Sequence, residues 1–108
     1  MTFAVSRRTV SETTVVAVRG EVDIETGPRL AAALRAAVEA GGPVVADLGA
    51  VTFMDTAGFS ALVSAHRLAD RAGGQLVLRG VSGQLRRLLG LLGLDALLTI
   101  EDDAPATC

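Results

Sequence analysis

The sequence predicts an α/β fold: one domain in which helices cover a mixed β-sheet of four to five strands, in the order β-β-α-β-α-β-α. The 108 residues suffice for one compact domain and are too few for two. Runs rich in β-branched residues come first, and short apolar runs then alternate with segments of helical period. Glycine and proline punctuate these segments, which sets the element boundaries.

A β-hairpin is expected at the N-terminus. Residues 3–6 alternate between apolar and polar side chains, and residues 14–19 are rich in β-branched side chains and end at Gly20. The polar residues 11–13 lie between them. They are therefore predicted to form the turn.

A first helix is expected from Thr26, which is a candidate N-cap. Pro28 falls in the first turn, where its missing N–H costs nothing. Glycines 41 and 42 are expected to stop the helix. Apolar residues recur every four positions along it: Leu30, Leu34 and Val38.

The middle of the chain predicts a buried strand and a second helix. Residues 43–48 form a short apolar run bounded by glycine and proline, typical of a central strand covered on both faces. A second apolar segment, residues 51–54, leads directly into a helix that begins near Thr56. That helix is expected to end at glycines 73 and 74.

The C-terminal part predicts a strand at residues 75–79, a helix capped by Ser82 and an edge strand at residues 97–100. Gly93 is expected to end the helix in the left-handed conformation. The helix carries an apolar stripe: Leu85, Leu88, Leu89 and Leu92. Residues 1–100 are therefore assigned to the domain, and residues 101–108 to a flexible acidic tail.

Composition excludes several functions. All ten basic residues are arginine, and the formal net charge is -2, so no basic footprint for direct nucleic-acid binding exists. Three Phe with no Trp or Tyr provide no stacking platform for bases. The absence of lysine removes Schiff-base chemistry and the phosphate-binding lysine of nucleotide-binding loops.

No enzyme site, metal site or cofactor is predicted. Cys108 is the only cysteine and His66 the only histidine, and they are far apart in sequence. We interpret His66 as a boundary histidine half-covered by its neighbours, with a role as ligand or base as the alternative. No signal peptide and no membrane-spanning apolar run is present, so a cytoplasmic protein without membrane contact is expected.

The corner at residues 53–59 is the candidate site. Steps of 100° along the helix place one arc toward the core: Gly58, Ala61, Leu62, Ala65, Leu68 and Ala69. The opposite stripe contains Thr56, Ser60, Val63, Ser64 and Arg67, with Phe59 at its margin. Exposed apolar groups beside a hydroxyl are typical of a docking surface. The alternative is that Thr56 only caps the helix and that Val63 is an ordinary exposed aliphatic residue.

Two motifs carry a family resemblance that covers residues 5–100. Residues 20–26, G-E-V-D-I-E-T, are similar to the G-E-L-D-x-x-T of STAS domains. Residues 47–58, D-L-G-A-V-T-F-M-D-T-A-G, are similar to the family's D-L-x-x-v-x-F-x-D-S-[ST]-G. Together, at this spacing, they resemble a stand-alone bacterial anti-sigma factor antagonist.

The resemblance implies partner switching. The unmodified protein binds an anti-sigma factor of the GHKL serine/threonine kinase type, which then releases its sigma factor. The kinase phosphorylates the antagonist, and a phosphatase reverses this. Thr56 stands at the family's phosphorylation position, and Ala57 replaces the second hydroxyl. The expected partner-binding residues are Asp23, Asp55, Thr56, Phe59, Ser60, Val63 and Arg67.

Two of these residues have local alternatives. Asp23 either faces the partner or caps its own turn, and Asp55 either orders the Thr56 hydroxyl or forms an Asx-type turn. Two other functions also stay open. One is a STAS subunit of a membrane complex for lipid or anion transport, where the same helix binds an ATPase. The other is a sensor of a small ligand or nucleotide.

Overall fold

The computed structural model describes residues 2–101 and has the element order that the sequence predicts. The elements are β1 (Phe3–Val10), β2 (Thr13–Val22), α1 (Gly27–Glu39), β3 (Val44–Met54), α2 (Thr56–Arg71), β4 (Leu76–Arg79), α3 (Gly83–Leu91), the 3-10 turn η1 (Leu94–Ala96) and β5 (Thr99–Ile100). Both apolar segments in the middle of the chain belong to one long strand, β3. The predicted α/β class is confirmed.

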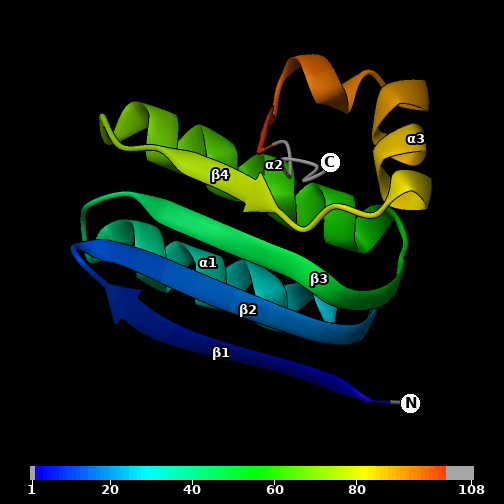
Figure 1. Cartoon of the computed structure of the whole chain (residues 1–108), viewed down its shortest axis with the longest axis horizontal. Helices are drawn as coiled ribbons and strands as arrows, with labels where there is room; N and C mark the ends of the chain where they lie inside the picture. The colour runs from blue at the N-terminus through cyan, green and yellow to red at the C-terminus, as the bar shows by residue number, and fades with distance from the viewer. Residues whose placement is uncertain (1, 102–108) are drawn as a thin grey trace, which may run out of the picture.

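The five strands form one mixed sheet in the order β1-β2-β3-β4-β5 (Figure 1). β1 pairs with β2 antiparallel, and the three remaining pairings are parallel. β3 is therefore the central strand, as predicted. Because β2, β3 and β4 run in the same direction, their carboxyl ends meet at one edge of the sheet.

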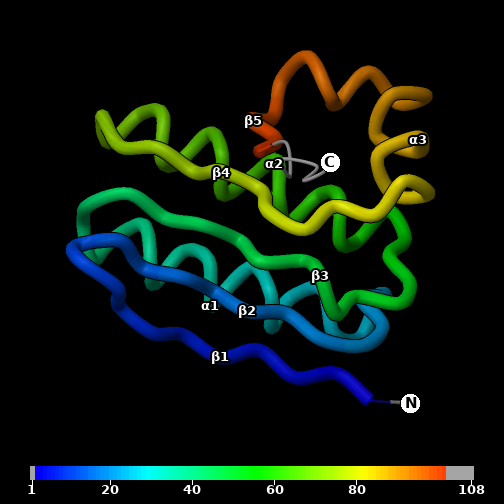
Figure 2. Tube along the Cα trace, viewed as in Figure 1, coloured from blue at the N-terminus to red at the C-terminus, as the bar shows by residue number. Residues whose placement is uncertain are grey.

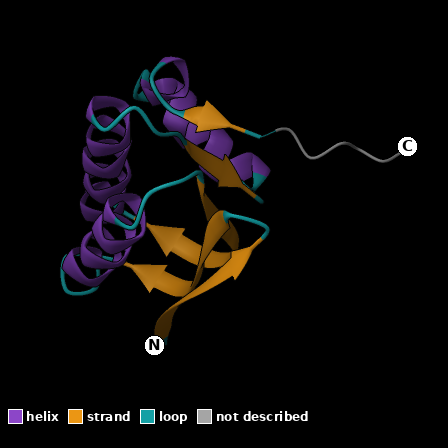
Figure 3. Ribbon diagram, turned by 90° about the vertical axis from the view of Figure 1, so that its left-hand side faces the viewer, coloured by secondary structure: helices purple, strands orange, loops and turns teal. Residues whose placement is uncertain are grey.

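The helices α1 and α2 pack against each other on one face of this sheet (Figure 3). Val16 and Val18 of β2 and Ala46 of β3 are buried beneath them. Side chains of a strand alternate between faces, so Ala17 and Asp47 point to the opposite face. The core is thus a layer of mostly aliphatic side chains between the sheet and the helices, with Met54 and Phe59 among its members.

The N-terminal hairpin is longer than predicted. Ser11 and Glu12 both have positive φ angles, 49° and 65°, which indicates a two-residue turn of type I′. β2 continues past Gly20 because two irregularities in its register with β3 let the strand bend without ending. Gly20 has a φ of 91°, and a side chain there would collide with the Thr2 carbonyl.

The third helix has the predicted cap and the predicted end, but its apolar stripe is less buried than predicted. The Ser82 hydroxyl accepts a hydrogen bond from the Leu85 N–H at 3.1 Å, and Gly93 is left-handed, as expected. Leu85 and Leu89 are buried, but Leu88 and Leu92 are exposed, so the predicted stripe is only half covered. The helical spacing of the leucines is as predicted. However, α3 lies at the end of the sheet (Figure 1), and only a narrow face of the helix, with Leu85 and Leu89, is buried.

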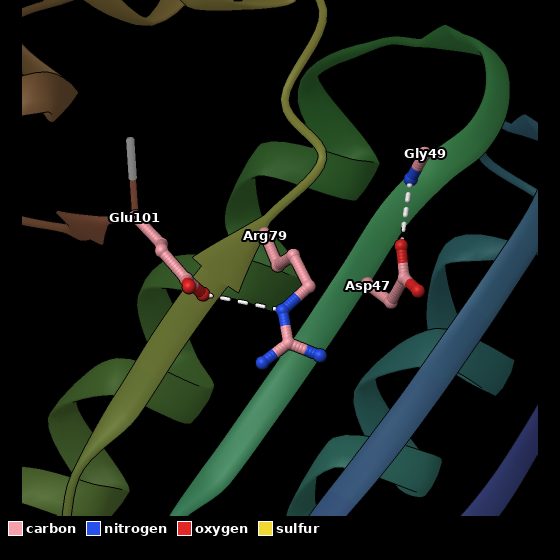
Figure 4. Close-up of polar contacts among 4 residues, drawn as sticks. All are labelled: Asp47, Gly49, Arg79 and Glu101. Atoms are coloured by element: carbon pink, nitrogen blue, oxygen red, sulfur yellow. Dashed lines mark hydrogen bonds and ion pairs between the residues drawn. The ribbon is translucent and has the colours of Figure 1, made fainter. Parts of the chain in front are cut away.

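The described chain ends in contact with the sheet. The predicted edge strand is reduced to Thr99–Ile100. Glu101 was assigned to the tail, yet its N–H donates to the Leu78 carbonyl at 2.8 Å and its Oε1 accepts from Arg79 Nε at 3.2 Å (Figure 4). The rest of the predicted tail, residues 102–108, and with it Cys108, lies outside the described residues.

The packing around Gly58 predicts a stability effect. A Cβ at this position would overlap the Met54 side chain and lie 2.9 Å from Val22 Cγ1. Gly58→Ala should therefore lower the free energy of unfolding by about 1–3 kcal/mol, measured by urea denaturation. Gly83→Ala is the matched control, because nothing lies within 4 Å of its Cβ position. Equal stability of the two variants would contradict this packing.

Candidate functional site

The candidate site lies at the sheet edge where β2 and β3 end and α1 and α2 begin (Figure 2). The Asp55 N–H donates to the Val22 carbonyl at 3.0 Å, which joins the two strand ends. The turn at residues 23–26 and the first turn of α2 are therefore neighbours. This brings the two sequence motifs together in space.

Asp55 is the N-cap of α2. Its Oδ1 accepts a hydrogen bond from the Ala57 N–H at 2.8 Å, and its backbone is extended, with φ -106° and ψ -166°. Of the two roles expected for Asp55, the structure shows the Asx-type turn. The alternative that Thr56 caps the helix is wrong, because Thr56 is the first helical residue.

Thr56 is exposed at the start of α2. Its hydroxyl makes no hydrogen bond to any residue in the range 2–101. An exposed hydroxyl with no internal partner is free to face another molecule. Its position in the first turn also favours negative charge, because the helix dipole and the unpaired N–H groups point there.

The turn before α1 is built by Asp23 and Thr26. Asp23 Oδ1 accepts hydrogen bonds from the N–H groups of Glu25 at 3.0 Å and Thr26 at 3.1 Å. The Thr26 hydroxyl accepts from the Asp23 N–H at 2.9 Å and donates toward the Glu21 carbonyl at 3.0 Å and Asp23 Oδ1 at 3.2 Å. The local role expected for Asp23 is therefore present, and the turn is held from several sides.

Thr26 occupies the N-cap position of α1, as predicted, but its side chain does not cap the helix. Its hydroxyl makes no cap hydrogen bond and belongs to the Asp23 turn. Its carbonyl still accepts from the N–H groups of Arg29 and Leu30. Competition from the turn explains the difference, because one hydroxyl cannot serve both structures.

Hydrogen bonding also changes the acidity of this turn. The pKa of Asp23 is lowered from its usual value, chiefly because the Thr26 N–H donates to the carboxylate. The Glu25 N–H and the Thr26 hydroxyl act in the same direction. The carboxylate is therefore ionised at neutral pH, in the residue that directly follows β2 and near the start of α2.

Close packing fixes the two helix starts against each other. A Cβ on Gly27 would lie only 2.9 Å from Ala57 Cβ. The absence of a side chain on Gly27 therefore lets the first turns of α1 and α2 touch. Because of this contact, the Asp23 turn and Thr56 hold a fixed relative position.

The predicted stripe along α2 is partly confirmed. Thr56, Ser60 and Arg67 are exposed, and Arg67 lies about 16 Å along the helix axis from Thr56. Val63 is half-buried against the core, contrary to the exposed position expected. Leu68, expected in the core, is also only half-buried.

Phe59 is the clearest error in the predicted surface. It is 7 % exposed and belongs to the core cluster, so it cannot contact a partner without rearrangement. The helical projection assumed one buried arc of limited width. In the folded chain α1, β3 and β4 all contact α2, which widens its buried face.

Two residues of this edge carry exposed apolar side chains for which no partner contact was predicted. Ile24 is 79 % exposed in the Asp23 turn, and Phe53 is 52 % exposed near the end of β3. Phe53 lies within the predicted corner, residues 53–59, and Ile24 lies within the first motif, residues 20–26. The signal for Ile24 in the sequence was an isolated isoleucine between two acidic residues.

The other candidate groups do not form a site. His66 is half-buried, as predicted, and its Nδ1 is buried without a hydrogen-bond partner in residues 2–101. Within the same residues, no three His, Cys, Asp or Glu side chains come close enough to hold a metal ion. No described helix is long and apolar enough to cross a membrane.

A shallow hollow of about 600 Å³ lies on the sheet face opposite the helices. Its lining includes small residues such as Ala4, Ser6 and Ala17, together with Arg19 and Asp47. Asp47 Oδ1 is engaged by the Gly49 N–H at 3.0 Å (Figure 4). The lining shows no buried, unpartnered polar group aimed at a ligand, so we assign no ligand to it.

Comparisons of the sequence and of the structure with known proteins indicate the same family. The model of the STAS domain matches residues 4–105. The anti-sigma-B factor antagonist of Listeria monocytogenes is 34 % identical over 86 residues, covering 79 % of this chain and 75 % of that protein. An anti-sigma factor antagonist from Mycobacterium paratuberculosis has a similar crystal structure, with 30 % identity, a TM-score of 0.78 and coverage of 95 % and 88 %. The Bacillus cell fate determinant SpoIIAA, solved in its phosphorylated form, shares the fold at 21 % identity and a TM-score of 0.71, covering 93 % of each chain.

The different roles of Asp55 and Thr56 predict different stability effects. Asp55→Ala removes the cap of α2 and should lower the free energy of unfolding by about 1 kcal/mol. Thr56→Ala removes no internal hydrogen bond and should change it by less than about 0.5 kcal/mol. Thermal and urea unfolding of both variants test this. A larger loss for Thr56→Ala would contradict the assignment.

The lowered pKa of Asp23 predicts a pH dependence. A carboxylate whose pKa is lowered by folding adds stability above its unfolded-state pKa, and this stability is lost as pH falls through the folded-state pKa. Asp23→Asn should therefore be less stable than the wild type at neutral pH, and the difference should shrink in acid. Urea denaturation from neutral to acidic pH measures it. A difference that does not change with pH would show that the charge contributes nothing.

Proposed function

The chain belongs to the STAS domain family, and we propose that it is an anti-sigma factor antagonist switched by phosphorylation of Thr56. In its unmodified form it binds an anti-sigma factor of the GHKL serine/threonine kinase type, in the cytoplasm. The bound anti-sigma factor releases its sigma factor to RNA polymerase. The antagonist itself catalyses nothing in this cycle.

The observation that carries the proposal is the exposure of Thr56 at the start of α2, with its hydroxyl unengaged in the described chain. The curated relative from Listeria monocytogenes is named an anti-sigma-B factor antagonist. A structural neighbour has been solved in a phosphorylated form. These names support both the role and the chemistry that we propose for this chain.

The switching step is a phosphoryl transfer from ATP bound to the partner kinase. The Thr56 oxygen attacks the γ-phosphorus, the bond to the β-phosphate oxygen breaks, and the hydroxyl proton passes to a base of the kinase. ADP leaves, and phosphothreonine remains. A phosphatase then uses water to return the hydroxyl and inorganic phosphate.

The added phosphate should spoil docking without unfolding the domain. It carries about -1.5 to -2 charges at pH 7. The N-terminus of an exposed helix favours an anion by about 0.3–1 kcal/mol, so the fold tolerates the group. Asp23 and Asp55 already carry negative charge at this edge, and the phosphate increases it. A partner surface shaped for a neutral hydroxyl must then desolvate a dianion, which opposes binding.

A binding experiment tests the proposal. Each GHKL-type anti-sigma factor encoded in the same genome is purified and titrated with the wild type, Thr56→Ser and Thr56→Glu by calorimetry. At least one should bind the wild type and Thr56→Ser tightly. Thr56→Glu should lose at least about tenfold in affinity, which corresponds to about 1.4 kcal/mol. Equal affinity of the wild type and Thr56→Glu would reject the switch and favour the transport-complex alternative.

A labelling experiment tests the modified residue. Incubation with ATP and the cognate kinase should add one phosphate, which mass spectrometry should locate on Thr56. ATP alone should label nothing, and Thr56→Ala should stay unlabelled with the kinase. A phosphate on Ser60 or Ser64 would defeat the assignment of Thr56. Labelling by ATP alone would overturn the non-enzymatic role.

A further inference from the structure

Ile24 is an exposed apolar residue that lies outside the core of the folded protein. Its side chain is 79 % exposed in the turn between β2 and α1. In the free protein this aliphatic side chain gains little from burial, and a partner that covered it would add that stabilisation to binding. A single exposed aliphatic residue is ordinary, so its surroundings must decide whether it binds something.

The turn presents Ile24 rigidly. The carboxylate of Asp23 and the hydroxyl of Thr26 bind backbone groups on both sides of Ile24. The Gly27 N–H also donates to the Asp23 carbonyl at 2.7 Å. A side chain on a preorganised turn loses little backbone entropy on binding, which is the property of an efficient anchor.

Ile24 also borders a hollow that reaches α2. The hollow has a volume of about 310 Å³, and its lining is uncharged: Ile24, Pro28, Ala31, Ala57, Ser60 and Ser64 are among its residues. Farther along the same helix pair, the next hollow is lined by Arg35, Glu39 and Arg71. The part nearest Thr56 is therefore the apolar part, and charge begins only at the distal end.

The hollow is close enough to Thr56 to be covered by the same partner. Ala57, which lines it, directly follows Thr56. A stable protein interface covers about 800 Å² on each partner, equivalent to a disc about 16 Å in radius. A protein centred on Thr56 therefore also covers Ile24 and the hollow beside it.

We infer that Ile24 is a specificity-determining anchor for the anti-sigma partner, which places an apolar side chain against it in the hollow between α1 and α2. This inference rests on the proposed function. It specifies the chemistry of the partner surface. That surface has a neutral, apolar group next to the Thr56 contact and charged groups farther along. Asp23 then acts as a positioning residue, because it shapes the turn that carries Ile24.

Three variants test the inference against the anti-sigma factor that binds the wild type. Ile24→Asp places a charge in the apolar contact and should weaken binding by about tenfold or more. Ile24→Leu keeps an aliphatic group of equal size and should bind within about threefold of the wild type. Val10→Asp is the matched control, because Val10 is also an exposed aliphatic residue, at 47 %, but it is the last residue of β1, beside the start of β2 and about 30 Å from the turn that carries Ile24. It should bind like the wild type.

Two further readouts separate an anchor from a residue needed for folding. The melting temperature of Ile24→Asp should match that of the wild type, because the side chain is not part of the core cluster. In phosphorylation by the partner kinase, Ile24→Asp should raise KM while kcat changes little, since Thr56 itself is intact. A fall in kcat at unchanged KM would overturn the anchor role.

The outcomes distinguish this inference from the proposed function. If Thr56→Glu loses affinity while Ile24→Asp binds normally, the anchor is refuted and the phosphorylation switch stands. If no anti-sigma factor binds the wild type, both are refuted. If Ile24→Asp instead converts a self-associated wild type to a monomer in sedimentation experiments, the hollow belongs to a second copy and the inference fails.

Discussion

The first turn of α2 lies in direct contact with the ends of β2 and β3, and the rest of the site depends on that contact. Gly58 leaves room for the Met54 side chain, and the Asp55 N–H is bonded to the Val22 carbonyl. On the side of α1, the absence of a side chain on Gly27 lets that helix approach Ala57. Two glycines therefore bring two helix starts and two strand ends to one edge, which places Thr56 beside the Asp23 turn.

The polar residues of this edge divide their roles according to chemistry. Asp23 and Asp55 each use a carboxylate oxygen to accept backbone N–H groups, so their first task is to hold turns in shape. Carboxylates suit this task because charged acceptors make stronger hydrogen bonds than neutral ones. Thr56 and Ile24 lie exposed at the same edge, and they are the groups that we propose contact the partner. The carboxylates thus stabilise the turns that hold an exposed hydroxyl and an exposed hydrocarbon group.

The sequence predicted those features that depend on local signals. The order of elements, the start of α2, the Ser82 cap and the left-handed Gly93 all follow from residues within one turn of each other. Features that depend on tertiary packing were not predicted. Phe59 is buried because three elements surround α2, and Leu88 and Leu92 are exposed because α3 meets the body on one face only. The N-cap position of Thr26 was predicted, but the hydrogen bonds of its hydroxyl were not, because the Asp23 turn and the helix cap compete for that group.

The tight fit of Gly58 between strand and helix also bears on how fast such a protein can signal. A first helical turn packed this closely leaves the backbone around Thr56 little room to rearrange. Under the proposed function, a phosphate on Thr56 would therefore act through the surface potential of this edge and not through a change of its backbone. The response time of the proposed switch would then be set by the turnover of the kinase and the phosphatase.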